Sequence, residues 1–292
     1  MNLSQILKDT IPGKYAVGSF SPRCARLIAP VLETAQKLKS PAIIQISQNE
    51  FNWFGVTPKE FADEYYLQLK KLHITVPTTL HLDHTKDPEV IRAAIDAGFE
   101  SVMIDASEKS LQENIAATKS IVALAHPKGV SVEAELGRIA SNDKIETVGD
   151  QELYTVPEEA LLFVDETGID ALAVSVGTAH GVYKTKAPTI DYAIIKKIRA
   201  LTPVYLVLHG GSGVPTDIMV NSYMIEGGGI SKVNIATDIE LAFLAGIGRE
   251  KRLSNKECNE LPDAIFKQGA ASVHELIEDK IKNYLRSDNK AK

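Results

Sequence analysis

The sequence has few cysteines and no long hydrophobic segment. Only Cys24 and Cys258 occur among 292 residues. They are far apart in the chain, so a disulfide framework is excluded and both thiols are expected to be reduced. The first ten residues contain no signal-peptide-like apolar region, and no apolar run approaches the ~20 residues that a membrane span needs. The sequence therefore predicts a cytoplasmic protein with no membrane partner.

Positive charge is also scarce. Lysine and arginine total 32 against 38 aspartate and glutamate residues, which gives a formal net charge of −6 and a sequence pI near 5.7. No basic block is longer than a few residues. Because nucleic-acid binding normally requires a clustered basic surface, no nucleic-acid partner is predicted.

Short β-branched runs alternate with longer amphipathic stretches along the chain. At 44% hydrophobic residues, the chain can bury one large core. Eight apolar strands are predicted at residues 16–20, 42–47, 78–84, 101–107, 131–137, 171–177, 204–210 and 231–236. Helices are predicted between them, for example at 58–72, 87–97, 111–125, 157–167 and 190–200. This alternation indicates a parallel (β/α)8 TIM barrel. We expect one domain over residues 1–292, with a C-terminal helical extension at about 257–287.

Three histidines stand at the ends of three separate predicted strands. His84 closes the third strand, His180 follows the sixth, and His209 lies in the last part of the seventh. Neutral imidazoles suit a zinc-class ion, and a catalytic zinc typically has three protein ligands and one open position. The pattern predicts a catalytic metal site. It does not distinguish zinc from cobalt or iron, since geometry and metal availability decide among them.

Other polar residues follow the same strand ends, where barrel enzymes place their active sites. Asp105 follows the fourth strand, Glu135 lies on the fifth, and Asn234 and Thr237 lie on or after the eighth. Asp83 precedes a histidine of the metal set. It is either the proton donor to a developing alkoxide or a carboxylate that orients a histidine, and both readings stay open.

A glycine-rich segment, Gly210-Gly211-Ser212-Gly213, follows the seventh strand and precedes a helical run. Consecutive backbone N–H groups there can bind an anion, and barrels often bind phosphate with the loops after strands seven and eight. The alternative is a plain tight turn. A phosphorylated substrate beside a metal ion would suit a reaction in which the metal polarises a carbonyl group.

Six motifs in register resemble the class II, zinc-dependent fructose/tagatose-bisphosphate aldolase family, over about residues 15–238. They are His81-Leu82-Asp83-His84, the segment 101–105, Val132-Glu133-Ala134-Glu135-Leu136-Gly137, the segment 177–184, His209-Gly210-Gly211-Ser212-Gly213 and the segment 232–237. The resemblance implies reversible aldol cleavage of a ketose (bis)phosphate to dihydroxyacetone phosphate and an aldehyde.

The resemblance also implies roles for individual residues. His84, His180 and His209 would hold the catalytic zinc, and Asp105 and Glu135 a second divalent ion. Asp83 would be the proton donor and Asn234 a contact to the enediolate. The region for dihydroxyacetone phosphate and a monovalent cation would contain Gly181, Lys184, Gly211, Ser212 and Thr237, and Ser47 would lie near the distal phosphate. A homodimer or homotetramer is expected.

Three departures from the family pattern affect these expectations. The loop after the fifth strand lacks the usual glycine pair, so Asp143 lies nearest the expected base and Glu146 is its competitor. Asp263 stands where the family has an arginine that reaches a neighbouring subunit's distal phosphate. Arg23, after the first strand, would then supply the missing positive charge, unless it is a solvated residue that opens the next helix.

Two other functions are compatible with part of the pattern. A metal-dependent hydrolase of the amidohydrolase kind also uses histidines at barrel strand ends, but it would need a His-x-His pair on the first strand, which residues 16–20 lack. A non-catalytic accessory subunit of the aldolase type would be expected to have lost metal ligands, whereas this chain keeps all three histidines. Retro-aldol turnover with bound metal distinguishes the three functions.

Overall fold

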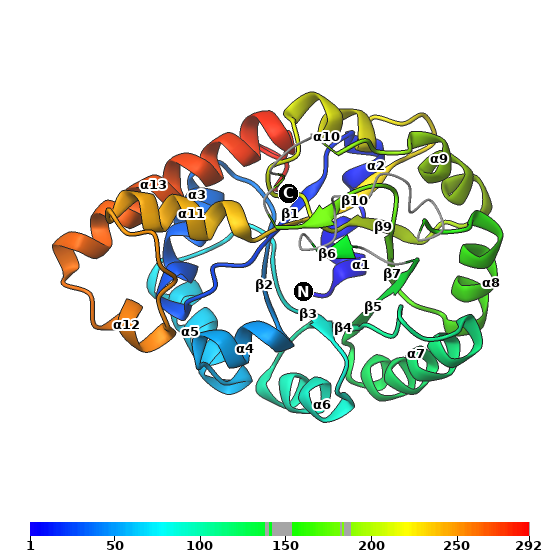
Figure 1. Ribbon diagram of the computed structural model, residues 1–292, viewed down its shortest axis with the longest axis horizontal. Coiled ribbons are helices and arrows are strands. Elements are labelled where there is room, and N and C mark those ends of the chain that lie inside the picture. Colours follow the sequence, from blue (N-terminus) through cyan, green and yellow to red (C-terminus); the bar gives the residue numbers. More distant parts are fainter. Residues whose placement is uncertain (138–139, 142–153, 182, 184–187, 292) are drawn as a thin grey trace.

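Eight parallel strands close into a barrel, with the helices outside it (Figure 1). A computed structural model describes residues 1–137, 140–141, 154–181, 183 and 188–291. The order around the barrel is β1-β10-β9-β7-β5-β4-β3-β2. The strands are β1 (Val17–Phe20), β2 (Ala42–Ser47), β3 (Thr78–Thr85), β4 (Ser101–Ile104), β5 (Ser131–Leu136), β7 (Ala171–Val174), β9 (Tyr205–Leu208) and β10 (Ile230–Ile235). The predicted TIM barrel is confirmed.

The helices that surround the barrel begin at sequence signals that are visible in advance. Thr57, Ser110 and Ser47 each accept a hydrogen bond from the backbone of a glutamate three residues later, in a capping box. The helices are α1 (Leu3–Leu7), α2 (Thr10–Gly13), α3 (Ile28–Lys37), α4 (Gln48–Phe54), α5 (Pro58–Lys71), α6 (Pro88–Ala97), α7 (Leu111–Ala125), α8 (Pro157–Thr167), α9 (Tyr192–Leu201), α10 (Thr216–Tyr223), α11 (Thr237–Gly246), α12 (Asn255–Asn259) and α13 (Asp263–Asp279). The described residues also include short 3₁₀ turns at Ala25–Leu27 and His126–Lys128 and a π-helical turn at Lys280–Tyr284.

Several predicted strands are longer than the observed ones at their carboxyl ends. β7 ends at Val174 rather than at residue 177. Gly177 has φ +112°, and a Cβ there would lie 2.1 Å from the Thr189 carbonyl oxygen, so the chain turns out of the barrel at this glycine. It continues as β8 (Ala179–His180), which pairs in parallel with β6 (Ala140–Ser141). The strand prediction missed this two-stranded sheet because each strand has only two residues.

The barrel interior consists of an apolar end and a polar end. Residues two apart on a strand face the same side, so each strand contributes an alternating inner row. The apolar end lies against α1 and includes Val17, Ile43, Met103 and Val207, although β4 and β5 begin there with Ser101 and Ser131. Further along the strands the inner row is polar, and its side chains hydrogen-bond to one another across the barrel, as between Gln45 and Asp83.

Helix α1 covers the apolar end of the barrel. Leu3, Ile6 and Leu7 pack with the apolar inner row, and α1 lies behind the ring of strands in Figure 1. The Leu3 N–H donates to Ser131 Oγ at 2.8 Å, which fixes the helix against β5. With this end closed by packed side chains, the other end is the one that can receive a ligand.

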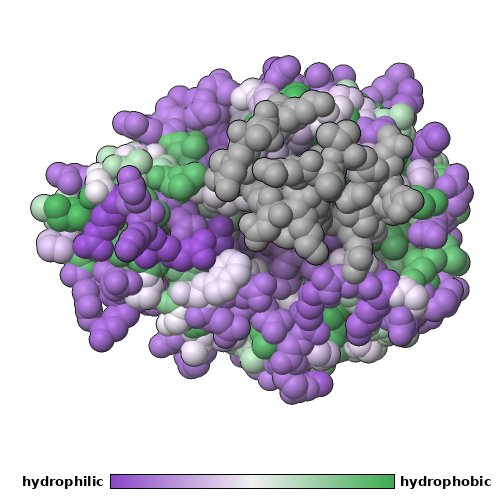
Figure 2. Space-filling model, in the orientation of Figure 1, coloured by the Kyte–Doolittle hydropathy of each residue, from purple (hydrophilic) through white to green (hydrophobic). Residues whose placement is uncertain are grey.

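No helix within the described ranges combines the length and the apolar character needed to cross a membrane. The described part of the face in Figure 2 is mostly hydrophilic, and its hydrophobic patches are separate from one another.

Replacing a buried residue of α1 should destabilise the barrel. We expect Leu7→Ala to lower the free energy of unfolding by about 2–5 kcal/mol, since Leu7 is fully buried and truncation leaves a cavity. Leu67→Ala is the matched control because Leu67 is 55% exposed, and its effect should stay within about 0.5 kcal/mol. Urea unfolding measures both. Equal effects of the two substitutions would contradict the proposed closure by α1.

Candidate metal centre

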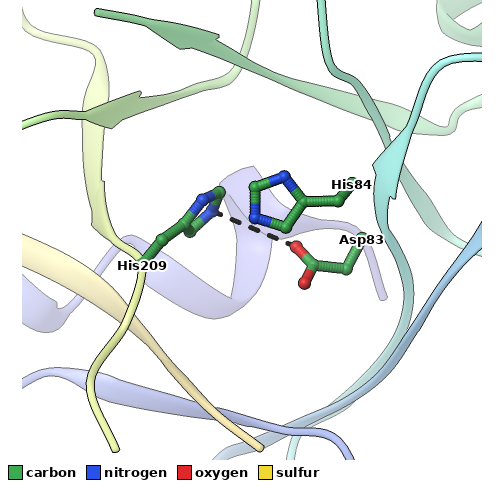
Figure 3. Close-up of side chains that lie close together, drawn as sticks. All are labelled: Asp83, His84 and His209. Atoms are coloured by element: carbon green, nitrogen blue, oxygen red, sulfur yellow. Dashed lines mark ion pairs between the residues drawn. The ribbon is translucent and has the colours of Figure 1, made fainter. Parts of the chain in front are cut away.

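Two of the predicted histidine ligands meet at the polar end of the barrel. His84 comes from β3 and His209 directly follows β9, and their ring centroids are 4.4 Å apart with the planes at 65°. Figure 3 shows both rings beside the Asp83 carboxylate, whose Oδ1 is 4.0 Å from His209 Nε2. One ligand atom from each of Asp83, His84 and His209 lies within 4.8 Å of the others. This spacing is suitable for one shared cation.

Asp83 and His84 reach the same site although consecutive strand residues normally face opposite sides. The pairing of β3 with β4 shifts register between Leu82 and Thr85, and His84 has φ +26°. Such an irregularity turns the end of a strand and re-aims its side chains. The bend in β3 therefore brings both residues to the mouth of the barrel.

Two carboxylates form a second group around His84. Asp105 Oδ2 lies 2.9 Å from His84 Nδ1, and Asp105 is itself held by Ser107 Oγ at 2.7 Å. Glu135 Oε2 lies 3.1 Å from His209 Nδ1 and 4.0 Å from His84 Nδ1. Asp105 thus orients His84, and ligand atoms of His84, Asp105 and Glu135 also lie within 4.8 Å of one another.

Asp83 is fixed by two amide side chains. Gln45 Nε2 donates to Asp83 Oδ2 at 3.1 Å, and Asn234 Nδ2 donates to Asp83 Oδ1 at 2.9 Å. Ser19 donates to Gln45 Oε1 and orients that amide. Asn234 Oδ1 is buried and has no hydrogen-bond partner among the described residues, so it can accept a donor from a bound molecule.

The electrostatics of this group favour a cation. Burial raises the pKa of Asp83, but His84, His209 and Lys232 outweigh it and hold the pKa at about 2. Burial lowers the pKa of His84, whereas Asp83, Asp105 and Glu135 raise it more strongly, to about 10. The imidazoles are therefore surrounded by ionised carboxylates. A set of imidazole nitrogens and carboxylate oxygens matches the ligands that a zinc-class ion takes.

A buried polar network lies one inner row below these residues. Lys232 Nζ contacts Glu133 Oε2 at 2.8 Å and His81 Nε2 at 3.3 Å, and Glu133 Oε1 contacts His209 Nε2 at 2.9 Å. Burial and the Lys232 charge lower the pKa of His81 to about 3. The pKa of Glu133 is lowered as well, because Lys232 and His209 outweigh its burial.

Sequence reasoning did not identify this network, although its signal is present. His81, Glu133 and Lys232 each lie two residues before a predicted site residue, namely Asp83, Glu135 and Asn234. The period of two along a strand places each on the inner face of the barrel. A charged residue at such a position could have been selected by this rule.

The structure describes only part of the loop after β5, where the base is predicted, and of the segment around His180. The backbone of His180 lies in β8, paired with Ser141 of β6, and Gly181 follows it with φ +98°. Asp143, Glu146 and Lys184 lie outside the described residues, and so does the His180 side chain.

The glycine-rich segment after β9 packs tightly against β10. The Gly211 N–H donates to the Asn234 carbonyl at 3.0 Å, and a Cβ at Gly211 would lie 2.5 Å from Val233 Cγ1. Ser212 Oγ accepts from the N–H groups of Ala236 and Asp238, both at 3.2 Å. The loops after β9 and β10 therefore meet beside Thr237, the first residue of α11.

Arg23 and Asp263 both form ion pairs. Arg23 is only 8% exposed, and its guanidinium pairs with Glu50 and, at 3.5 Å, with Glu240. The reading of Arg23 as a solvated residue is therefore wrong, because folding buries it between two acids. Asp263 Oδ1 pairs with Arg26 Nη2 at 2.6 Å.

Ser47 and Ser21 lie against the same glutamate. Ser47 caps α4, and its backbone N–H donates to Glu50 Oε2 at 2.8 Å. Ser21 Oγ donates to Glu50 Oε2 at 3.0 Å. Glu50 therefore ties the loop after β1 to the end of β2.

Comparisons with known proteins agree along the whole chain. The family model described as fructose-bisphosphate aldolase class-II matches residues 1–290. A fructose-bisphosphate aldolase of Geobacillus stearothermophilus is 36% identical over 97% of this chain and 96% of its own. One from Giardia intestinalis is 37% identical over 97% and 92%. The crystal structure of the YdjI aldolase from Escherichia coli K12 has a TM-score of 0.83 at 31% identity, covering 100% of this chain and 99% of that one.

Proposed function

Since the chain belongs to the class II fructose-bisphosphate aldolase family and is a carbon–carbon lyase of the kind that cleaves ketose bisphosphates, we propose how its residues divide the reaction. The family is zinc-dependent, and its substrates are sugar phosphates. The proposed reaction is reversible cleavage to dihydroxyacetone phosphate and an aldehyde. The observation that carries the proposal is the meeting of His84, His209 and three carboxylates at the open end of the barrel.

The family match decides against the two other functions considered from the sequence. A barrel hydrolase of the amidohydrolase kind and a non-catalytic accessory subunit are both displaced, because the chain is a class II aldolase over its full length. The position of His84 and His209 agrees with this.

The catalytic zinc would be held by His84, His180 and His209, and a second divalent ion by Asp105 and Glu135. A bound zinc ion would polarise the ketose carbonyl. The chain's own part is to keep the two described imidazoles in place: Asp105 contacts His84 Nδ1, and Glu133 contacts His209 Nε2.

Asp83 is proposed to move the hydroxyl proton. In the cleavage direction its ionised carboxylate takes the proton from the hydroxyl group, and in the condensation direction it returns that proton. Two observations support this over an orienting role. The carboxylate that contacts His84 Nδ1 is Asp105 rather than Asp83, and Gln45 and Asn234 aim Asp83 at the site.

Asp143 and Glu146 remain the two candidates for the base that removes a proton from dihydroxyacetone phosphate. Asn234 is proposed to contact the reacting carbon skeleton. The buried Asn234 Oδ1, with no hydrogen-bond partner in the described part of the chain, supports that role.

The phosphate of dihydroxyacetone phosphate is proposed to bind where the loops after β9 and β10 meet, together with a monovalent cation. The start of α11 at Thr237 offers a helix N-terminus there, and Ala236 at its N-cap makes no side-chain cap hydrogen bond. The residues proposed for this region are Gly181, Lys184, Gly210, Gly211, Ser212 and Thr237.

A homodimer or homotetramer is also proposed. Large apolar side chains are exposed at Trp53 on α4, Leu241 on α11 and Ile265 on α13. These helices lie on the same side of the barrel in Figure 1, which supports an apolar contact between subunits on that side.

At the acceptor end of the substrate, we propose that a distal phosphate is held weakly. Arg23 was the candidate for a replacement cation, but its charge is compensated by Glu50 and Glu240. Asp263 stands where the family has an arginine and is itself paired with Arg26, so this position offers no charged donor to a distal phosphate. Ser47 is retained as a neutral contact.

Removing the metal should abolish turnover. We expect an extensively chelated sample to lose ketose phosphate cleavage and to regain it when zinc is restored, because three histidines are proposed to bind the ion. A sample treated with zinc-saturated chelator is the control. Full activity in protein shown to be metal-free by elemental analysis would refute the metal mechanism and direct the search to a Schiff-base lysine.

Replacing the proton-transfer groups should lower kcat and leave zinc bound. Asp83→Asn and the variant of the true base should each lose about 10²- to 10⁴-fold in kcat, the usual contribution of a general acid or base. Solvent-isotope incorporation into dihydroxyacetone phosphate should stop in only one of Asp143→Ala and Glu146→Ala, so each is the other's control. Normal exchange in both variants would show that neither is the base.

The acceptor end should show little preference for a second phosphate. We expect kcat/KM for fructose 1-phosphate to equal or exceed that for fructose 1,6-bisphosphate. Asp263→Arg should shift the ratio toward the bisphosphate by roughly tenfold or more, since charge-assisted hydrogen bonds contribute about 1.5–3 kcal/mol. Asp63→Arg, an exposed change on α5, is the control. A strong wild-type preference for the bisphosphate that Asp263→Arg leaves unchanged would mean that another residue holds that phosphate.

A further inference from the structure

A fully buried ion pair lies beneath the candidate metal centre. Glu133 on β5 and Lys232 on β10 are both 0% exposed, and Lys232 Nζ is 2.8 Å from Glu133 Oε2. The desolvation penalty of burying two charges offsets much of their Coulomb attraction, and a protein with well-packed apolar residues in such a place is often at least as stable. Stability alone therefore gives no reason for the pair.

The second oxygen of Glu133 contacts a proposed zinc ligand. Glu133 Oε1 lies 2.9 Å from His209 Nε2. An ionised carboxylate only accepts hydrogen bonds, so Nε2 must carry the hydrogen. An imidazole that donates through Nε2 offers Nδ1 to a metal. The Nδ1 atom of His209 contacts Glu135 Oε2 at 3.1 Å. Because a metal ligand must be free of its hydrogen, a metal ion bound at Nδ1 would take the place of the hydrogen in that contact, while the Nε2 contact to Glu133 is kept.

Lys232 is in turn fixed from the other side of the barrel. Its ammonium group also donates to His81 Nε2 at 3.3 Å, so His81 has its hydrogen on Nδ1 and donates to Ser101 Oγ at 2.8 Å. Lysine has donors only, and both described contacts are acceptors. The series of hydrogen bonds Ser101–His81–Lys232–Glu133 therefore ends on His209 and allows the His209 ring only one orientation.

We propose that Glu133, with Lys232 behind it, is a positioning residue that fixes the His209 ring with Nδ1 toward the metal. The inference rests on the proposed function, in which His209 binds zinc. Groups that hydrogen-bond to metal-bound histidines typically change metal affinity by 10- to 100-fold when they are replaced.

The test is zinc affinity in Glu133→Gln. Glutamine keeps the shape of the side chain but offers one acceptor oxygen where the Lys232 and His209 donors occupy two. We expect the zinc dissociation constant, measured by competition with a chelating dye, to rise 10- to 100-fold. The visible spectrum of the cobalt-substituted protein should change as well, since it reports ligand geometry. Thermal unfolding of the metal-free protein shows whether the variant is folded.

A second variant guards against misfolding. Lys232→Met alone would leave Glu133 as an uncompensated buried charge. The double variant Glu133→Gln/Lys232→Met removes both charges and is therefore measured beside Glu133→Gln. We expect the double variant to fold and to bind zinc as weakly as Glu133→Gln does. Asp170→Asn is the matched control. Asp170 lies just before the start of β7, at the opposite end of the barrel, and its Oδ2 contacts His126 Nε2 at 2.9 Å. Replacing this carboxylate should leave zinc affinity within about twofold of the wild type.

The outcomes separate this inference from the proposed function. If wild-type protein does not bind zinc, the proposed function fails. If the wild type binds zinc and both Glu133→Gln and the double variant bind it equally well with unchanged cobalt spectra, the positioning role of Glu133 is overturned and His209 can remain a ligand. Weaker zinc binding and a changed cobalt spectrum in the folded variants, with Asp170→Asn unaffected, support the role.

Discussion

Closure of eight parallel strands into one barrel is the constraint on which the rest of the structure depends. Closure forces alternate residues of every strand into a small shared interior. The interior therefore gathers an apolar cluster on the side of α1 and polar side chains toward the carboxyl ends of the strands. Helix α1 covers the apolar end, so the polar rows can hold a site at the other end.

The excess of carboxylates over cationic side chains inside the barrel increases toward that open end. Deepest in the polar part, Lys232 compensates Glu133 and both are out of contact with water. At the mouth, Asp83, Asp105 and Glu135 gather around His84 and His209 with no lysine or arginine paired to them among the described contacts. A site with more carboxylates than cations attracts a divalent ion. The same acids hold the imidazole rings in place, so the candidate metal site and its support are one hydrogen-bonded unit.

Outside this group, other charges are paired within the chain. Arg23 lies between Glu50 and Glu240, and Arg26 joins Asp263 while donating to the Cys258 carbonyl at 3.3 Å. These pairs join the loop after β1 to α4, α11 and the α12–α13 region. This region is thus built from structural ion pairs, which distinguishes it from the glycine-lined loops after β9 and β10.

The sequence by itself determined the barrel, the order of its elements and the polar residues at the strand ends, because hydrophobic period, helix caps and glycine positions are local signals. His84, His209, Asp105, Glu135 and Asp83 were selected on that basis, and the fold brings them together. Tertiary structure alone decided the contacts across the barrel. That Asp105 orients His84, that Arg23 is neutralised, and that Lys232 meets Glu133 and His81 all depend on strands distant in sequence. Register and closure set those distances, and a linear pattern of residues does not contain them.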